Sequence, residues 1–410
     1  MTAKERVKIA LSHREPDRVP IFEVAFDNKL ASKILGKQVY IHNGASTYKK
    51  AIECNMLERE VRKEYIKEGA LANVDLYTNL GYDIIAPSVT EFLAPVNCNF
   101  GIFGTNYIFD TTTKPIERNV WRISSTEGFW SLHKYSEESD TLSTIANSIS
   151  EGGVTHFRKY IDYISSLDTN LNDWTRDGLD TMKIVLESEP VRNGELFVLG
   201  RAEICFPAFE PHLELFLETM ITEPKLIDRY MEVTTEGVLT LLRAQLDMGV
   251  DGILGANDWC DNNGPFFSPS MFDRFFVPHM KRIVDECHKY GVPFIKHLDG
   301  NVTKLLPSLV NNVGIDGLHP NEPKAGMEIG NLKGEYGDKI TLLGNLDCAD
   351  LLVNGTQEMI VDAVKDIIKK ASKGGGHIFS SSNSIHGGIP LRNVQTMIDA
   401  VKEFGEYPIR

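Results

Sequence analysis

Short apolar runs recur from about residue 195 onward at intervals of roughly 25 to 45 residues, and helical patterns separate them. Each run begins with apolar residues and ends with polar ones. This alternation is typical of repeated βα units around a parallel sheet. The runs are ELFVLGRAEICF (195–206), DGILGAND (251–258), FIKHLDGN (294–301), GIDGLHPNE (314–322), ITLLGNLD (340–347) and HIFSSSNSIHGG (377–388).

Two of the intervening segments show helix signals. Residues 268–291 open with Ser268 as N-cap and Pro269 at the first helical position, and an apolar stripe follows. We expect one long amphipathic helix here, kinked at Pro278. Residues 356–376 repeat the pattern, with a threonine as cap and glycines as the stop. Both segments are predicted crossover helices between strands.

Two earlier apolar runs, VPIFEV (19–24) and YDIIAPS (82–88), bring the candidate parallel strands to eight. Eight strands with intervening helices predict an α/β fold of the (β/α)8 TIM barrel type. The alternative is an open doubly wound sheet. No G-x-G-x-x-G follows any of the runs, so the dinucleotide-binding form of that alternative lacks its main signal.

The rest of the chain fits around this barrel. Residues 95–190 begin with hairpin-like sequence and continue as a polar helical segment, so we interpret them as an insertion at the barrel mouth. A helix over residues 3–12 is expected to cap the barrel. The chain, residues 1–410, is therefore predicted to be a single barrel domain with one insertion.

Composition narrows the class of protein. The 410 residues are 42% hydrophobic and 24% charged, which is ordinary globular usage. No apolar run approaches the roughly 18 residues of a membrane span, and the first twenty residues show no apolar core of a secretion signal. We therefore expect a cytoplasmic protein that does not enter a membrane.

Charge and cysteine usage exclude further classes. The net charge of -14 argues against a nucleic-acid groove or an anionic membrane surface, since both need clustered Lys and Arg. The six cysteines lie far apart without a C-x-x-C, so neither a disulfide framework nor a thiolate zinc finger is expected. The partner is then a small molecule or another protein, and a homodimer stays open.

Nearly every predicted strand ends in a carboxylate, an amide or an imidazole. In a TIM barrel these ends surround the site of chemistry. One polar strand end has a simple structural explanation, because a strand turns polar where it meets solvent. The coincidence over eight strands favours a functional site. The candidates are Glu23, Glu203, Asn257, Asp258, His297, Asp299, His319, Glu322, Asn345, Asp347, Ser382, Asn383 and His386.

His297 and Asp299 are the leading pair, because residues two apart on a strand point to the same side. They can share one metal ion or one substrate. The alternative is that Asp299 caps the next helix and His297 is a satisfied barrel histidine. Structural roles are equally open for His319, which lies in a proline-rich turn, and for His386, which lies in a glycine-containing loop.

The chain resembles the uroporphyrinogen decarboxylase superfamily. The resemblance covers residues 1–25, 80–90 and 195–410, and the middle segment poorly. It implies a (β/α)8 barrel and one of two activities: decarboxylation of a tetrapyrrole's acetate arms, or cobalamin-dependent methyl transfer with a separate corrinoid protein. The similar stretches are REPDRVPIFE, SPSMFDRFFVPHMKRIVDECHKYGVPFIKHLDGN, GIDGLHPNEPKAG, LLGNLDCADLLVNGTQEMI and GGGHIFSSSNSIHGGIPLRNVQTMIDAVKEFG.

Departures from the family pattern separate these activities. The decarboxylases use an arginine-rich N-terminal stretch, whereas IFEVAFDNKLASKILGK has no arginine, and an acidic mouth would repel a polycarboxylate. Thiol-methylating members hold zinc on His-x-Cys and a later cysteine. Here His297 matches, Asp299 replaces the first cysteine, and SSSNS stands on the last strand. Without thiolates, a thiol acceptor is not expected.

The resemblance therefore implies a methyltransferase of the O-demethylase type. We expect it to move a methyl group from a small methylated substrate, an aromatic methyl ether above all, to cobalamin carried by a partner corrinoid protein. Zinc on His297, Asp299 and Glu322, or a proton, would act at the leaving oxygen. Phe206, Phe266 or Trp259 would hold the aromatic ring. Catalysis is assigned to His297, Asp299, Glu322 and Asp258, and substrate binding to Glu23, Glu203, Asn257, Trp259, His319, Asn345, Asn383 and His386.

Three other functions stay open at this stage. The first is transfer in the opposite direction, from a methylated corrinoid to an acceptor. The second is a lyase similar to uroporphyrinogen decarboxylase. The third is a ligand-binding barrel without catalysis, which would hold no metal.

Overall fold

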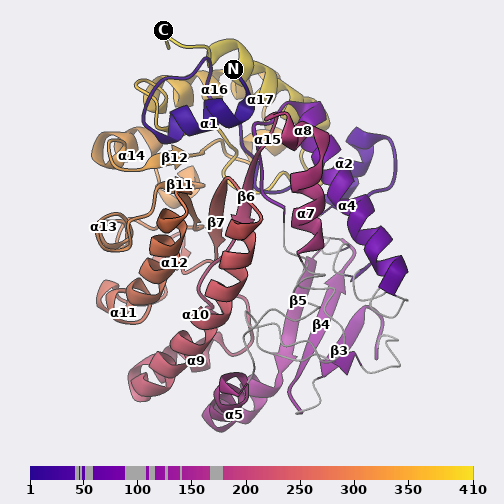
Figure 1. The fold of residues 1–410 in the computed structure, drawn as a ribbon, viewed down its shortest axis with the longest axis vertical. Helices are drawn as coiled ribbons and strands as arrows, with labels where there is room; N and C mark the ends of the chain where they lie inside the picture. Colours follow the sequence, from indigo (N-terminus) through magenta and orange to yellow (C-terminus); the bar gives the residue numbers. More distant parts are fainter. Residues whose placement is uncertain are drawn as a thin grey trace.

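A parallel sheet forms the centre of the protein in this computed structural model, which describes residues 1–41, 46, 49–50, 59–87, 108–109, 116–124, 128–138, 141–166 and 179–409. The strand order is β1-β6-β7-β10-β11-β12-β13, and every neighbouring pair is parallel. Helices surround the sheet (Figure 1). The strands are β1 (Ile84–Ile85), β6 (Phe197–Arg201), β7 (Gly252–Ala256), β10 (Phe294–His297), β11 (Gly317–His319), β12 (Thr341–Leu343) and β13 (His377–Ile378).

The run at residues 19–24 closes the sheet into a ring. Ile21 forms a parallel bridge with Phe379, just beyond β13, and Phe22 forms one with Ile84 of β1. The Phe22 amide donates to the Phe379 carbonyl at 2.8 Å. All eight predicted strand segments therefore take part in one barrel, and the open doubly wound alternative is wrong.

The barrel interior is a small core that one helix closes. Apolar side chains from every strand of the ring except β11 meet there, and Val7 and Ala10 of α1 (Ala3–Leu11) join them. Thr2 starts this helix with a capping box to Glu5, so the chain enters it in a fixed direction. The predicted N-terminal cap is confirmed, and Figure 1 shows α1 at one end of the barrel.

A buried ion cluster fixes the segment HREPDRVP against this end. Asp83 accepts from Arg6 Nη1 at 2.6 Å and from Arg18 Nη1 at 2.7 Å, and it also accepts the Ile21 amide at 2.8 Å. Asp17 binds the other side of Arg6 at 2.6 Å. Two guanidinium groups around one buried carboxylate therefore set the register of the ring-closing strand.

The crossover helices confirm the predicted pattern with one correction. Residues 268–291 form two helices, α11 (Pro269–Phe275) and α12 (Val277–Lys289), instead of one kinked helix. The break lies at Phe276 because Pro278 has no amide to donate and disfavours helical geometry in the residues before it. Ser268 caps α11 by accepting the Met271 amide, as predicted.

The second predicted crossover helix is α16 (Gln357–Ala371), whose cap Thr356 accepts the Met359 amide. Glycines at 374–376, all with positive φ, turn the chain into β13. The remaining helices of the described residues are α2 (Asn28–Leu35), α4 (Arg59–Leu80), α5 (Ser148–Ser165), α7 (Asp180–Glu187), α8 (Glu189–Arg192), α9 (Leu213–Thr222), α10 (Pro224–Asp247), α13 (Leu306–Ser308), η2 (Leu309–Val313), η3 (Pro323–Ala325), α14 (Ile329–Tyr336), α15 (Leu351–Asn354) and α17 (Leu391–Phe404).

The middle of the chain adds an antiparallel sheet of order β2-β3-β4-β5, followed by α5. Hairpin pairing followed by a helix matches the predicted pattern for 95–190, part of which lies outside the described residues. In Figure 1 this sheet lies towards the end of the barrel opposite α1. Its strands are β2 (Ile108–Phe109), β3 (Val120–Ser124), β4 (Trp130–Ser136) and β5 (Thr141–Asn147), and a two-stranded ribbon follows β7 as β8 (Cys260–Asp261) and β9 (Gly264–Pro265).

The structure also bears on membrane insertion and on disulfide bonds. Within the described part of the chain, no helix combines the length and the apolar character that crossing a membrane would need. Cysteines 205, 260, 287 and 348 are all buried, and no disulfide joins any two of them.

Candidate active site

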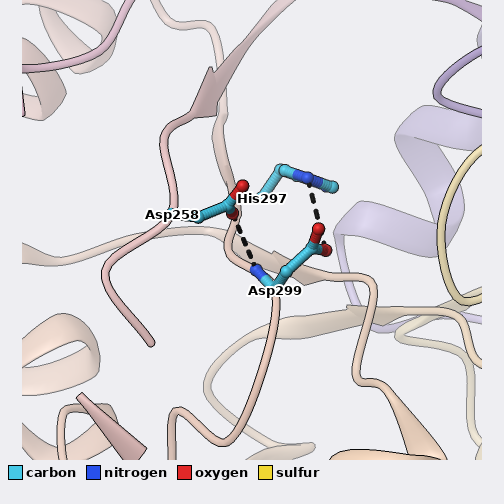
Figure 2. Close-up of side chains that lie close together, drawn as sticks. All are labelled: Asp258, His297 and Asp299. Carbon is cyan, nitrogen blue, oxygen red and sulfur yellow. Dashed lines mark hydrogen bonds and ion pairs between the residues drawn. The ribbon is translucent and has the colours of Figure 1, made fainter. Parts of the chain in front are cut away.

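Three side chains meet where β7 and β10 end. His297 is the last residue of β10 and lies beside Ala256 of β7, so Asp258 and Asp299 follow from neighbouring strand ends. One ligand atom from each of Asp258, His297 and Asp299 lies within 4.8 Å of the other two. Figure 2 shows both carboxylates beside the imidazole. We call these residues the Asp-His-Asp cluster.

One hydrogen bond and one close approach define the geometry of the cluster. The Asp299 amide donates to Asp258 Oδ1 at 3.0 Å, which ties the two loops to each other. His297 Nε2 lies 3.5 Å from Asp299 Oδ1, as the second dashed line in Figure 2 marks. The side chains of His297 and Asp299 therefore approach each other, with Asp299 two residues beyond the end of β10.

Burial controls the charges in the cluster. His297 is 8% exposed, and burial lowers its pKa to about 4, so the imidazole is neutral at pH 7. Burial, and then the nearby Asp258 carboxylate, raise the pKa of Asp299 to about 7. Two carboxylates and a neutral imidazole in a partly dry site favour the binding of a cation or a proton.

Outer contacts orient both Asp299 and His297. Asn383 Nδ2 donates to Asp299 Oδ2 at 2.6 Å. His297 Nδ1 and His319 Nδ1 lie 2.6 Å apart, so one hydrogen lies between these two nitrogens and His297 Nε2 is left facing Asp299. The two rings stack with centroids 4.9 Å apart. Metal-ligating residues are typically held by such second contacts.

The cluster fits a divalent metal ion. Asp299 Oδ1 is buried and accepts no hydrogen bond, although buried carboxylate oxygens normally do. One imidazole and two carboxylates match the nitrogen and oxygen donors of a catalytic zinc site, which has three protein ligands and one open position. Asp258, His297 and Asp299 are therefore the residues that would hold such an ion.

The third predicted ligand needs correction. Glu322 lies outside the set of described ligand atoms that meet within 4.8 Å of one another, and its Oε2 accepts the Gly300 amide at 2.6 Å, which fixes the loop after β10. Burial raises the pKa of this carboxyl group. Among the described residues, Asp258 takes the place in the ligand set that we had assigned to Glu322.

The sequence reasoning missed Lys296, whose side chain is fully buried. Its ammonium pairs with Glu203, donates to the Asn257 carbonyl at 3.0 Å and lies 4.0 Å from the Trp259 ring centroid. Glu203, predicted to bind substrate, is therefore half of a structural ion pair that holds the segment carrying Asp258. A lysine inside the apolar run FIKHL was the signal, since lysine is almost never fully buried unless it is paired.

Two other predicted substrate contacts at this strand end are structural. Trp259 is fully buried and packs against Phe272 and Phe276, so it cannot stack on a ligand at the mouth. Asn257 Nδ2 donates to the carbonyls of Ile204 and Phe206 at 3.1 and 3.2 Å, which fixes the loop after β6. Both assignments are corrected for the same reason: packing or backbone contacts occupy the side chain.

Asn345 and His386 also contact backbone. Asn345 Nδ2 donates to the carbonyls of residues 321 and 327 at 3.0 and 3.1 Å, and this side chain is 5% exposed. His386 Nδ1 accepts the Gly388 amide at 3.2 Å, and its Nε2 lies 3.3 Å from the Cys348 carbonyl. These contacts shape the loops around the mouth.

Glu23 lies fully buried at the barrel end that carries the cluster. Its carboxyl group contacts the Ser381 hydroxyl at 2.9 Å and the Ser381 amide at 3.3 Å. Burial raises the pKa of Glu23 to about 8. The same hydroxyl lies 2.5 Å from the Asn383 carbonyl, so Glu23 is connected through Ser381 to the residue that binds Asp299.

Comparison with known proteins supports the resemblance. Residues 210–404 match the family described as Uroporphyrinogen decarboxylase (URO-D). The chain is 29% identical over 198 residues to uroporphyrinogen decarboxylase from Coxiella burnetii, covering 46% of this chain and 51% of that protein. It is 27% identical over 237 residues to the enzyme of that name from Desulfotalea psychrophila, covering 55% of this chain and 66% of that one.

The fold is shared over nearly the whole chain with a solved structure. A methyltransferase from Methanosarcina mazei matches with a TM-score of 0.63 at 19% identity, covering 98% of this chain and 99% of that one. The chain spans about half the length of the first curated relatives it matches. The predicted resemblance to the uroporphyrinogen decarboxylase superfamily and the TIM-barrel-like fold are thereby confirmed.

Proposed function

We propose, from the match of residues 210–404 to the uroporphyrinogen decarboxylase family and from the Asp-His-Asp cluster, that this chain is a methyltransferase. It would transfer a methyl group from a small methylated substrate, best an aromatic methyl ether, to the cobalt of a separate corrinoid protein. The same fold serves a methyltransferase in Methanosarcina mazei, so the architecture is compatible with this chemistry.

The observation that carries the proposal is the donor set of the cluster. It offers two carboxylates and one neutral imidazole, and no cysteine of the described residues belongs to it. Oxygen and nitrogen donors leave a zinc ion a harder Lewis acid than thiolates do, which suits an oxygen leaving group better than a thiol. An ether oxygen is therefore the atom we place nearest Asp299 and His297.

The reaction breaks one bond and forms another. The methyl group would leave the ether oxygen for the cobalt(I) of the corrinoid, which supplies the electron pair of the new bond, and the substrate departs as a phenolate. A zinc ion held by Asp258, His297 and Asp299 would supply Lewis acidity to that phenolate oxygen. Asn383 and His319 keep Asp299 and His297 in place, so the donor atoms need no rearrangement during the reaction.

Aromatic side chains are available for the ring of such a substrate. Phe266 is 38% exposed, and its ring stacks on that of Phe206 at 6.4 Å and 14° between the planes. Because Trp259 is buried, Phe266 is the predicted ring-holding residue that a ligand can reach. The offset stacking of one more ring on Phe266 is the contact we expect.

Metal content and methyl transfer test the proposal together. Metal analysis of the purified protein should give one zinc per chain, and the Asp299→Asn variant should lose it. Asp261→Asn is the matched control, because Asp261 is exposed and caps its own turn through the amides of residues 263 and 264. The control should keep its metal.

The transfer assay uses cob(I)alamin with a panel of methoxyarenes and follows the absorbance of methylcobalamin. Wild-type protein and Asp261→Asn should form it, and Asp299→Asn should be slower by at least about 100-fold if it loses a metal ligand. Absence of methylcobalamin with every methoxyarene would refute ether demethylation. Full activity of Asp299→Asn would refute the role of the cluster.

A further inference from the structure

A cavity that contains none of the three residues of the Asp-His-Asp cluster lies between the antiparallel sheet and the loop that joins β6 to α9. Residues of β4, β5 and α5 form one side, and residues 205–212 with one side chain of α10 form the other. The cavity volume is about 120 Å3. Such a volume suits a ligand head group of a few heavy atoms. Of its described lining, Phe206 alone has a place in the proposed methyl transfer, as the ring on which Phe266 stacks.

Aromatic rings make up much of its wall. Phe129, Tyr160, Phe206 and Tyr230 line it from four different segments. The rings of Phe129 and Tyr160 stand almost perpendicular, at 79° with centroids 5.4 Å apart, so they form a corner. The face of an aromatic ring is electronegative, so a ring that turns a face to this space favours a cation there.

Among the described residues of the lining, Glu210 is the only acidic one, and none of them is a lysine or an arginine. Its carboxylate accepts from Thr144 Oγ1 at 3.2 Å and from Asn147 Nδ2 at 3.1 Å, and both of these donors are neutral. No lysine or arginine of the described residues forms an ion pair with it. Burial raises the pKa of Glu210, because the anion has lost water without gaining a cation.

The two histidines of the lining do not supply the missing positive charge. Burial lowers the pKa of both His133 and His212 to about 4, so each imidazole is neutral at pH 7. Asn147 Nδ2 also contacts His212 Nδ1 at 3.0 Å, which makes this nitrogen an acceptor, as a neutral ring requires. Of the described residues that line the cavity, Glu210 is therefore the one acidic group, and none is cationic at pH 7.

We propose that this cavity binds a small organic cation with a methylated ammonium head group. Glu210 would neutralise its charge, and the surrounding rings would contact the methyl groups through cation–π interactions. A neutral ligand would leave the carboxylate uncompensated in a partly dry site, and an anion would be repelled by it. Asn257 holds the backbone of Phe206 from beside Asp258, so the cavity adjoins the loops of the cluster.

This inference does not rest on the proposed methyl transfer, and a binding measurement tests it without corrinoid or metal. The probes are choline and 3,3-dimethylbutan-1-ol, its neutral carbon isostere, titrated into the full-length protein by calorimetry. Choline should bind roughly tenfold more tightly than the isostere, because the two differ only in the charge that Glu210 and the rings recognise.

Glu210→Gln keeps the side-chain shape and removes the charge, so it should weaken choline binding roughly tenfold and leave the isostere unaffected. Glu214→Gln is the matched control, since this carboxylate is exposed on α9 and does not line the cavity. Equal binding of the two probes, or no binding of choline at millimolar concentration, would overturn the proposal. Unchanged choline affinity in Glu210→Gln would also overturn it. If that variant does not fold, the comparison of choline with its isostere on wild-type protein still tests the proposal.

Discussion

Replacing Glu23 with glutamine should remove a large part of the pH dependence of folding. The hydrogen bonds of the Ser381 hydroxyl group indicate that the Glu23 carboxyl group is protonated. The Ser381 hydroxyl has one hydrogen but two oxygen neighbours, Glu23 Oε1 at 2.9 Å and the Asn383 carbonyl at 2.5 Å. Both contacts are satisfied only if the Glu23 carboxyl group is protonated and donates to Ser381. The amide of a glutamine would provide a donor to Ser381 at every pH, although it would lose the hydrogen bond that Glu23 Oε1 accepts from the Val24 amide at 3.2 Å.

The size of the effect follows from the pKa. Burial raises the pKa of Glu23 from its ordinary value of 4.5 to about 8, which corresponds to about 5 kcal/mol at 1.36 kcal/mol per pH unit. The folded state binds this proton more tightly than the unfolded state does. Its stabilising contribution is therefore complete below pH 4.5 and is lost as the pH rises through 8. Between pH 5 and pH 8 the loss amounts to about 3.5 kcal/mol.

The assay is the free energy of unfolding in guanidinium chloride at pH 5 and pH 8, followed by tryptophan fluorescence. Wild-type protein should lose about 3.5 kcal/mol more than Glu23→Gln over this interval, because only the wild type gives up the proton. Glu403→Gln is the control, since this exposed carboxylate lies on α17, and it should behave like the wild type. Parallel pH dependence in wild type and Glu23→Gln would refute the protonated state.

Three further substitutions test other parts of the structure. Asp83→Asn should lower the free energy of unfolding by about 3 to 5 kcal/mol, because it removes the buried charge that Arg6 and Arg18 share, whereas Asp17→Asn should cost about 1 kcal/mol in urea titrations. Asn383→Ala should weaken zinc binding about 10- to 100-fold in competition with a chelator, because Asp299 loses its donor. Lys296→Met should destabilise the fold by about 3 to 5 kcal/mol by leaving a carboxylate buried alone, and unfolding curves would report it.

Each of these expectations has an outcome that contradicts it. Equal losses in Asp83→Asn and Asp17→Asn would mean that burial does not decide the strength of these ion pairs. Unchanged zinc affinity in Asn383→Ala would mean that Asp299 is held by other contacts. If Glu203→Gln added to Lys296→Met restored none of the stability, the loss would come from packing instead of from the unpaired charge.

The barrel could be predicted because it depends on periodic features. Apolar runs that end in polar residues identify strands whose carboxyl ends face one site, and the eight runs all join the ring. The alternation of side chains along a strand also predicted that His297 and Asp299 lie on the same side of the chain. The break at Phe276 could not be located as well, because the effect of Pro278 on preceding residues is spread over a helical turn.

Roles that depend on a partner were harder to predict. Glu203, Asn257 and Asn345 lie where a ligand contact was expected, but their partners are a lysine or backbone carbonyls brought there by the fold. Glu322 was predicted to bind the metal because it also follows a strand end, but its carboxylate accepts a hydrogen bond from the Gly300 amide. Sequence order gives the strand end of a residue but not which of several polar neighbours its side chain will reach.

The closure of the ring by residues 21 and 22 has a consequence for biosynthesis. Ile21 pairs with Phe379, so residues 21 and 22 cannot complete the ring until almost the whole barrel has been translated. This takes roughly 20 to 70 s at ribosomal rates. Throughout that time its apolar side chains and unpaired backbone groups are open to solvent and to other nascent chains. The barrel is therefore expected to fold after synthesis, and its yield in cells should depend on chaperones that cover this segment.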